Sequence, residues 1–381
     1  MPHHFTSEEL RGWLRLSLEP GLTPAPARQL LAALGLPQHI YQSSTATLTR
    51  HLPADLAAQM AGEPSDPLQA AIAQATDWLE QAGHHILTLA DPAYPAALLD
   101  LHDPPLLLYA NGDLDCLGRP ALAIVGARNA TQSGQETARD FAGTLAAQGW
   151  CIVSGLAAGI DQAAHHGALR AGQQGGSTIA IMGTGMDLVY PAAHRALAHQ
   201  IAGQGLLLSE LPLGTRALPH HFPRRNRLVA ALSKGVLVVE AARQSGSLIT
   251  ARLAGELGRE VFAIPGSIHS PLSRGCHALI RQGAKLVESA QDILDELGGA
   301  APSGLPPCAI SPPPAPTNTD NPLPEELRPI LERIDFAPLS ADQLLRRTGL
   351  LATELPAVLA ELELAGCIEA LPDGRFQRLK P

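Results

Sequence analysis

The chain has 381 residues, 45% of them hydrophobic and 17% charged, which excludes an intrinsically disordered protein and predicts two or three globular domains. Its five cysteines are dispersed and never in CxxC spacing, which argues against a disulfide framework and a zinc site. No apolar run resembles a signal peptide or is long enough to cross a bilayer, so we expect a cytoplasmic protein without a membrane partner.

The net charge of −9 is unevenly distributed along the chain. Residues 1–118 carry 4 Lys or Arg against 13 Asp or Glu, whereas residues 119–299 carry 16 against 12. Residues 300–381 carry 7 against 11. The middle third is the only basic part, so an anionic partner is expected there. Charge alone does not establish an anionic partner, because so small an excess of basic over acidic residues also arises by chance.

Residues 5–85 have the pattern of short amphipathic helices, and 7–9 form a good helix start. Residues 21–31 resemble a turn that leads into a second helix, as in SAM-like or helix-hairpin-helix modules. Such modules contact the DNA backbone through a helix N-terminus. Arg28 is the one cation nearby, so packing or protein interaction is the expected role. We assign residues 1–88 to an N-terminal helical, SAM-like domain.

Short continuous apolar runs recur through the middle third, separated by helical stretches. They lie at residues 121–125, 151–153, 178–182, 206–208, 236–239, 261–264 and 285–287. Runs without alternation predict strands covered on both faces, as in a parallel sheet between helices. We therefore predict a Rossmann-like α/β domain over 89–299, a doubly wound, mostly parallel sheet. Ligands of such sheets bind beyond the carboxyl ends of the strands.

The last part of the chain divides into a linker and a small domain. Residues 301–324 contain nine prolines, which predicts a Pro-rich extended linker over 300–323. Residues 324–381 have the winged-helix order of three helices and a two-stranded hairpin. The expected recognition helix, 352–365, carries three glutamates and no Lys or Arg. A protein contact or a vestigial role is therefore favoured over phosphate binding.

Four segments, 124–128, 154–161, 222–227 and 245–250, are predicted to be loops at the carboxyl edge of the sheet, and they combine glycines, hydroxyl groups and cations. Helix N-termini and guanidinium groups bind anions, and an aromatic ring stacks a base. Each segment alone has an ordinary interpretation as a turn, a helix cap or a solvated charge. Together they predict a track for the phosphates of an unpaired strand. The predicted DNA-binding residues are Gly126, Arg128, Ser154, Gly155, Phe222, Arg224, Arg225, Asn226, Arg227, Ser245, Gly246, Ser247 and Thr250.

Templates for enzymes are not matched. The chain has no P-loop and no G-x-S-x-G elbow, and 183–187 lack the third glycine of a dinucleotide fingerprint. We predict no catalytic residue, no metal and no cofactor. An alternative remains, a phosphoribohydrolase-like enzyme or Mg²⁺-dependent phosphodiesterase that uses four acids near strand ends, Asp161, Asp187, Glu210 and Glu240. In the ordinary interpretation, the charge of Asp161 complements the N-terminus of its helix and the other three acids brace arginines.

The same segments resemble the DNA-processing protein A (DprA/Smf) family. The matching motifs are AIVGAR at 123–128, SGLAAGID at 154–161, FPRRNRLVA at 222–230, SGSLITA at 245–251 and GREVFAIPG at 258–266. Gly183-Thr184-Gly185 followed by Tyr190-Pro191 matches as well, and the resemblance is dense over about 90–290.

The resemblance implies a homodimer that binds single-stranded DNA without cleaving it. It also implies protection of incoming strands during natural transformation and help in loading the RecA recombinase. By motif, Arg128 would bind phosphate and residues 225–227 would lie beside the DNA path. Two positions depart from the family: 192–194 read Ala-Ala-His where many relatives carry a lysine, and His277 replaces a common asparagine near the expected dimer contact. In a third hypothesis, the sheet is only a scaffold whose outer modules recruit partners.

Overall fold

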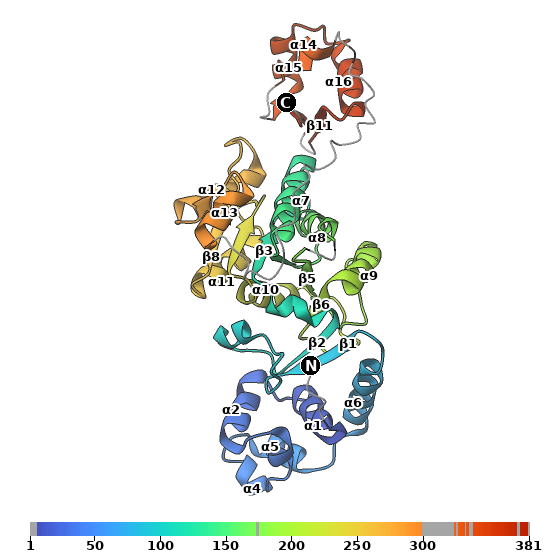
Figure 1. Cartoon of the computed structure of the whole chain (residues 1–381), viewed down its shortest axis with the longest axis vertical. Helices are drawn as coiled ribbons and strands as arrows, with labels where there is room; N and C mark the ends of the chain where they lie inside the picture. Colours follow the sequence, from blue (N-terminus) through green and yellow to red (C-terminus); the bar gives the residue numbers. More distant parts are fainter. Residues whose placement is uncertain are drawn as a thin grey trace.

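The computed structural model describes residues 6–172, 175–298, 324, 327–331, 333–334, 338–371 and 374–379. The predicted linker at 300–323 lies outside the described residues. The N-terminal helices, the large sheet and the C-terminal domain follow one another along the long axis of the molecule (Figure 1). No helix in these ranges has both the length and the apolar character that crossing a membrane requires.

The N-terminal segment is helical, as predicted. Its helices are α1 (Ser7–Leu18), α2 (Pro24–Leu34), α3 (Pro37–Tyr41), α4 (Thr45–Leu48), α5 (Ala54–Ala61) and α6 (Asp66–Leu79). Thr6 and Glu9 form a capping box at the start of α1. Leu16, Leu30 and Met60 are among the buried side chains that hold the first five helices together.

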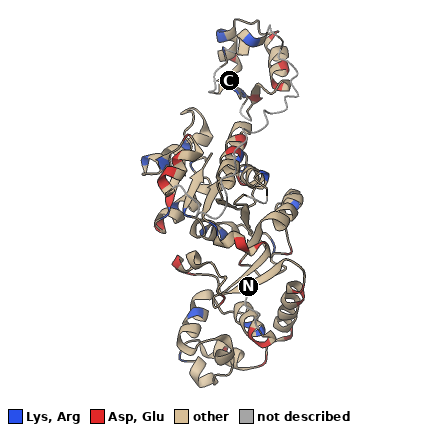
Figure 2. Cartoon of the chain, in the orientation of Figure 1, with Lys and Arg blue, Asp and Glu red and all other residues tan. Residues whose placement is uncertain are grey.

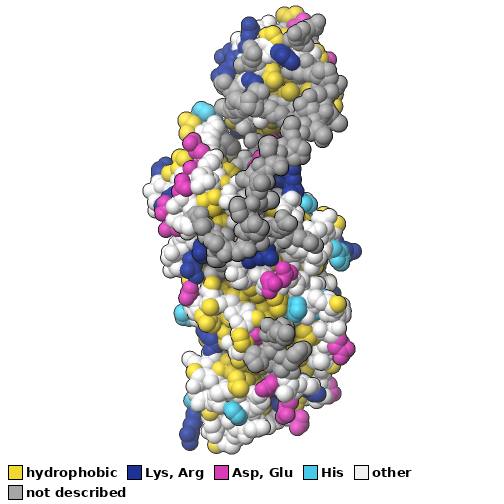
Figure 3. Space-filling model, viewed as in Figure 1, with side chains coloured by type: hydrophobic (Ala, Val, Ile, Leu, Met, Phe, Trp, Pro, Cys, Tyr) yellow, Lys and Arg dark blue, Asp and Glu magenta, His cyan; other side chains and the backbone are white. Residues whose placement is uncertain are grey.

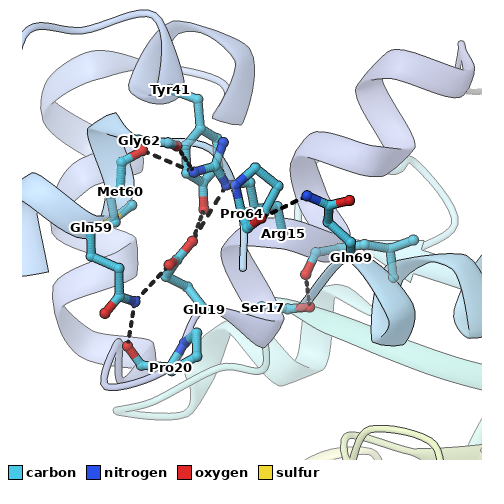
Figure 4. A network of polar contacts seen from close by, with 11 residues as sticks. Arg15, Ser17, Glu19, Pro20, Tyr41, Gln59, Met60, Gly62, Pro64 and Gln69 are labelled. Carbon is cyan, nitrogen blue, oxygen red and sulfur yellow. Dashed lines mark hydrogen bonds and ion pairs between the residues drawn. The ribbon is translucent and has the colours of Figure 1, made fainter. Parts of the chain in front are cut away.

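A polar network centred on Arg15 ties these helices to one another (Figure 4). The Arg15 guanidinium donates to the carbonyls of Met60 (3.0 Å) and Gly62 (2.6 Å) and pairs with Glu19 at 3.5 Å. It also lies 3.9 Å from the centre of the Tyr41 ring. Burial and the neighbouring Glu19 raise the pKa of Tyr41 far above its ordinary value. The network is therefore a stabilising element of this helical layer.

A nine-stranded sheet forms the centre of the molecule, in the order β1-β2-β6-β5-β4-β3-β7-β8-β9. The strands are β1 (His84–Thr88), β2 (Leu107–Gly112), β3 (Ala121–Val125), β4 (Cys151–Ser154), β5 (Thr178–Ile181), β6 (Leu206–Ser209), β7 (Gly235–Val238), β8 (Glu260–Ala263) and β9 (Lys285–Leu286). In this sheet order, every neighbouring pair from β6 through β5, β4, β3, β7 and β8 to β9 is parallel. The doubly wound, mostly parallel sheet and its seven predicted strands are confirmed.

Two strands at one edge were not predicted. β1 pairs antiparallel with β2, and β2 pairs antiparallel with β6. The boundary proposed after residue 88 therefore separates β1 from the strand with which it pairs. These strands extend the sheet toward the N-terminal helices (Figure 1).

Helices cover both faces of the sheet because alternate strand residues point to opposite sides. Leu122 and Ile124 of β3 pack under α7 (Gln132–Ala147), α8 (Ile160–Arg170) and α13 (Ala290–Leu297). Ala123 and Val125 pack on the other side, under α10 (His221–Ala231), α11 (Ser247–Glu256) and α12 (Arg274–Arg281). A further helix, α9 (Arg195–Gln204), covers β5 and β6. This layering brings the loops after β3, β4 and β7 to one edge.

The C-terminal domain has the predicted winged-helix elements. They are α14 (Arg328–Leu331), β10 (Leu339–Ser340), α15 (Ala341–Thr348), α16 (Leu355–Leu364), β11 (Ile368–Ala370) and β12 (Arg375–Arg378). The short strand β10, not predicted, pairs with β12. The first of the three expected helices lies partly outside the described residues. On α16, Glu361 and Glu363 are exposed, and Glu354 is exposed just before it.

Candidate nucleic-acid interface

A cation and two aromatic rings lie together at the carboxyl edge of the sheet. The guanidinium carbon of Arg128, in the exposed turn after β3, lies 5.6 Å from the centre of the Phe222 ring. The Phe222 ring lies 5.5 Å from that of Tyr190, which is 52% exposed. We call these three residues the aromatic platform. A Cβ at Gly183 would approach the Phe222 ring to 2.9 Å, so glycine there leaves room for the ring.

The prediction that Arg128 and segment 222–227 converge is therefore confirmed. The prediction that 222–227 is a loop is wrong, because these residues form the first two turns of α10. Pro223 does not prevent this, since the amide groups of the first helical turn have no partner within the helix. Helical geometry then separates the three arginines. Arg224 keeps a side chain that is 44% exposed, whereas Arg225 and Arg227 are buried.

Arg225, only 4% exposed, lies beneath the glycine-rich turn after β4. Its Nη1 donates to the carbonyl of Ile181 at 2.9 Å, and its guanidinium fills the space that a Gly155 side chain would need. The buried Asp161 carboxylate accepts from the amides of Gly155 (3.1 Å) and Ala157 (3.4 Å). Burial raises the pKa of Asp161, against the effect of Arg225, and lowers the pKa of Arg225 to about 10. This pair of charges organises the turn from inside.

Arg227 is held by two acids from distant parts of the chain. It forms an ion pair with Glu210, after β6, and its Nε lies 3.5 Å from Asp103. Glu210 also pairs with Arg224 at 3.4 Å. Burial raises the pKa of Glu210, and Arg227 and Arg224 oppose this effect. Figures 2 and 3 show basic and acidic side chains close together in the region where α10 lies.

The sequence predicts that a helix N-terminus after β3 offers free amides to an anion, but at the start of α7 side chains of the protein itself bind these amides. Glu240 accepts from the Thr131 amide (2.9 Å) and hydroxyl (2.8 Å), and the Gln132 amide donates to Glu369 of β11 at 2.7 Å. The Gly134 amide donates to the Thr131 hydroxyl at 2.9 Å. Burial raises the pKa of Glu240, and its bonds with Thr131 oppose this effect. The chain's own carboxylates thus occupy the place of an external anion.

The other predicted residues divide between surface and interior. Gly246 is exposed at the N-cap of α11, and Asn226 donates to its carbonyl at 3.4 Å. Ser245 is half-buried and shares a hydrogen bond of 2.7 Å with the buried Ser247. Thr250, one turn later, is buried as well.

Two more predicted residues have interior roles. The Ser154 hydroxyl is buried and donates to the carbonyl of Ile124 at 2.6 Å. A Cβ at Gly126 would lie 2.5 Å from Ile160, so this glycine lets β3 and α8 approach closely.

Sequence reasoning did not select Tyr190 or Arg243 as site residues. Tyr190 follows β5 by nine residues, and the exposed Arg243 lies between β7 and Ser245. A position shortly after a parallel strand was the available signal for both.

The four acids near strand ends are bonded to the chain itself. Asp187 accepts from the Gly214 amide at 2.8 and 2.9 Å, so neither it nor Glu240 braces an arginine as the ordinary interpretation expected. Glu210 pairs with Arg224 and Arg227, and Asp161 lies in the first turn of α8, so for these two acids that interpretation agrees with the structure. Within the described part of the chain, no group of three or more His, Cys, Asp or Glu side chains could hold a metal ion.

Comparison with known proteins adds to this geometry. A sequence model of the family described as "DNA recombination-mediator protein A" matches residues 85–298, and one described as "DprA winged helix domain" matches residues 312–374. The chain is 43% identical over 304 residues to "Protein Smf" of Escherichia coli, covering 80% of this chain and 79% of that protein.

Two solved structures are similar. DNA processing protein A of Streptococcus pneumoniae superposes with a TM-score of 0.61 and 37% identity, covering 76% of this chain and 98% of that one. A structure on the single-stranded DNA binding mode of DNA processing protein A from Helicobacter pylori has a TM-score of 0.51 and 33% identity, covering 56% and 95%.

Proposed function

Because this chain belongs to the DNA recombination-mediator protein A family, we propose that it binds single-stranded DNA, without cleaving it, at the carboxyl edge of its sheet. The observation that carries this proposal is the aromatic platform, in which Arg128 lies over Phe222 beside the exposed Tyr190. Aromatic faces stack unpaired bases of any sequence, and arginine neutralises the phosphates between them. The bases of a duplex are already stacked on one another, so the platform favours single strands.

The predicted site residues take two roles in this proposal. Arg128, Phe222, Arg224, Asn226, Ser245 and Gly246 contact the strand, together with Tyr190 and Arg243. The half-buried Gly126, at which β3 and α8 approach closely, and the buried residues Ser154, Gly155, Arg225, Arg227, Ser247 and Thr250 hold the contacting residues in place. This division follows exposure, because a side chain that solvent does not reach cannot contact a phosphate without a rearrangement.

The biological role we propose is that of the family. The protein protects incoming single strands during natural transformation, assists loading of the RecA recombinase and acts as a homodimer in the cytoplasm. Support comes from the similar protein of Helicobacter pylori, whose single-stranded DNA binding mode has been described. The acidic exposed face of α16 supports a protein partner for the winged helix rather than DNA.

We also propose that binding involves no catalysis. The carboxylates that a nucleotide-acting enzyme would use are bonded to the chain's own amides, hydroxyls and guanidinium groups. No contact within the described ranges favours the alternative of a metal-dependent phosphodiesterase or phosphoribohydrolase.

The test is a fluorescence-anisotropy titration with single- and double-stranded oligonucleotides of equal length at several salt concentrations. Arg128→Ala is expected to weaken single-strand binding and to reduce the log–log salt slope by about 0.7, the value for one lost phosphate contact. Phe222→Ala should weaken binding with the slope nearly unchanged. Arg252→Ala, which removes an exposed arginine paired with Glu256 on α11, is the matched control. Equal affinities of wild type, Arg128→Ala and Phe222→Ala would refute the proposed site.

A further inference from the structure

Residues 100–105 run from the last residue of the 3-10 helix η1 (Ala96–Asp100) toward β2, and a side chain of the N-terminal helices is bonded to them. Arg28 of α2 donates from Nη2 to the carbonyl of His102 at 2.7 Å and from Nη1 to that of Pro104 at 3.4 Å. Arg28 belongs to the part of the chain that precedes the family match at 85–298. Its guanidinium therefore joins the N-terminal helices to a segment of the sheet domain and is not a free phosphate ligand.

The same segment holds the basic helix α10. Asp103, whose side chain is 40% exposed, lies 3.5 Å from Arg227, whose side chain is only 9% exposed. Arg227 pairs with Glu210, and Glu210 pairs with Arg224 at the surface. A continuous series of charged contacts thus runs from Asp103 to the exposed end of α10.

Packing supports this connection. Leu98 and Leu101 belong to the same buried cluster as Leu228 and Val229 of α10, and α10 contacts η1 directly. The Tyr94 hydroxyl donates to the carbonyl of Pro105 at 2.9 Å, which fixes the other end of the segment. The segment has little freedom to move without α10.

We propose that Asp103 is a positioning residue for DNA binding, and that Arg28 holds the segment that carries it. Together they keep α10 in the orientation that presents Phe222 and Arg224 at the edge of the sheet. This proposal rests on the proposed function. The N-terminal helices then contribute to DNA binding indirectly, because the Arg28 guanidinium holds backbone carbonyls of the sheet domain and not a DNA phosphate.

The sign of the effect separates positioning from simple electrostatics. Removal of a negative charge near a polyanion site ordinarily strengthens binding, because the local field becomes more positive. Loss of a positioning carboxylate weakens binding, because Arg227 loses a partner and α10 shifts. Asp103→Asn is therefore expected to weaken single-strand binding about three- to fivefold, the range of a partly exposed ion pair.

The experiment measures single-strand affinity for the wild-type full chain, four single variants and one double variant. Asp103→Glu should keep wild-type affinity, since it restores the carboxylate. Asp100→Asn is the matched control, because it removes the same charge from the same segment but from a pair with Arg259 at 2.7 Å. Arg28→Met should weaken binding, and its combination with Asp103→Asn should cost less than the sum of the two.

A second measurement does not depend on DNA. Amide hydrogen exchange over 221–231 in the free protein should be faster in Asp103→Asn than in wild type or Asp100→Asn, since α10 loses a tether. Equal or tighter DNA binding by Asp103→Asn, or unchanged exchange in α10, would overturn the positioning role. A wild-type protein that binds no single-stranded DNA would overturn the proposed function. The hydrogen-exchange result would then still decide whether Asp103 tethers α10.

Discussion

Replacement of Gly155 by alanine tests how the interior of the DNA edge is built. A Cβ at this position would lie 2.5 Å from Nη2 of Arg225 and closer still to Nη1, distances that real Cβ atoms do not tolerate. The guanidinium must therefore leave its bond with the carbonyl of Ile181. The backbone angle φ of Gly155 is not in the left-handed region, so the substitution adds no backbone strain.

The magnitude follows from the charges left behind. Leaving a buried charged donor without its hydrogen-bond acceptor costs about 3 kcal/mol or more, and each kcal/mol lowers the melting temperature of a domain of this size by about 2–4 °C. Gly155→Ala is thus expected to melt roughly 6–12 °C below wild type. It should also bind single strands more weakly, because the turn after β4 is displaced.

Thermal unfolding monitored by circular dichroism measures this effect. Gly255→Ala on α11 is the matched control, because nothing lies within 4 Å of its added Cβ. Alanine in the interior of a helix is favoured over glycine by about 1 kcal/mol, so this control should melt at or above the wild-type temperature. Equal melting temperatures of wild type and Gly155→Ala would refute the steric argument.

Two further predictions concern the neighbouring contacts. Burial raises the pKa of Glu240 above its ordinary value of 4.5, so the folded state binds this proton more tightly than the unfolded state does. Its contribution to stability is therefore present below pH 4.5 and is lost as the pH rises through the raised pKa. Glu240→Gln should make the unfolding free energy depend less on pH in that range, as measured by denaturant titrations at several pH values. An equal pH dependence of the unfolding free energy in wild type and Glu240→Gln would contradict this. Gly183→Ala places a methyl group 2.9 Å from atoms of the Phe222 ring, so the ring must shift. Single-strand affinity in anisotropy titrations should fall with an unchanged salt slope, since no charge is lost; a clear reduction in the slope would show that the platform acts otherwise.

Much of the fold was predictable because its strands are buried on both faces. Such strands appear in a sequence as short apolar runs, and all seven parallel strands were found in this way. β1 and β2 were missed because they pair antiparallel at the edge, between segments whose proximity no local pattern signals. The convergence of Arg128 with 222–227 was also predictable, since parallel strands bring the loops that follow them to one edge.

By itself, the sequence determined the kinds of side chain that gather at this edge: glycines, hydroxyl groups, arginines and an aromatic ring. Only the tertiary structure decided which of them solvent reaches. Arg224, Arg225 and Arg227 look equivalent in the chain, yet a helix turns the last two inward, toward Ile181 and Glu210. The physical reason is that charge belongs to a residue, whereas desolvation and pairing depend on neighbours such as Asp103, more than a hundred residues away along the chain.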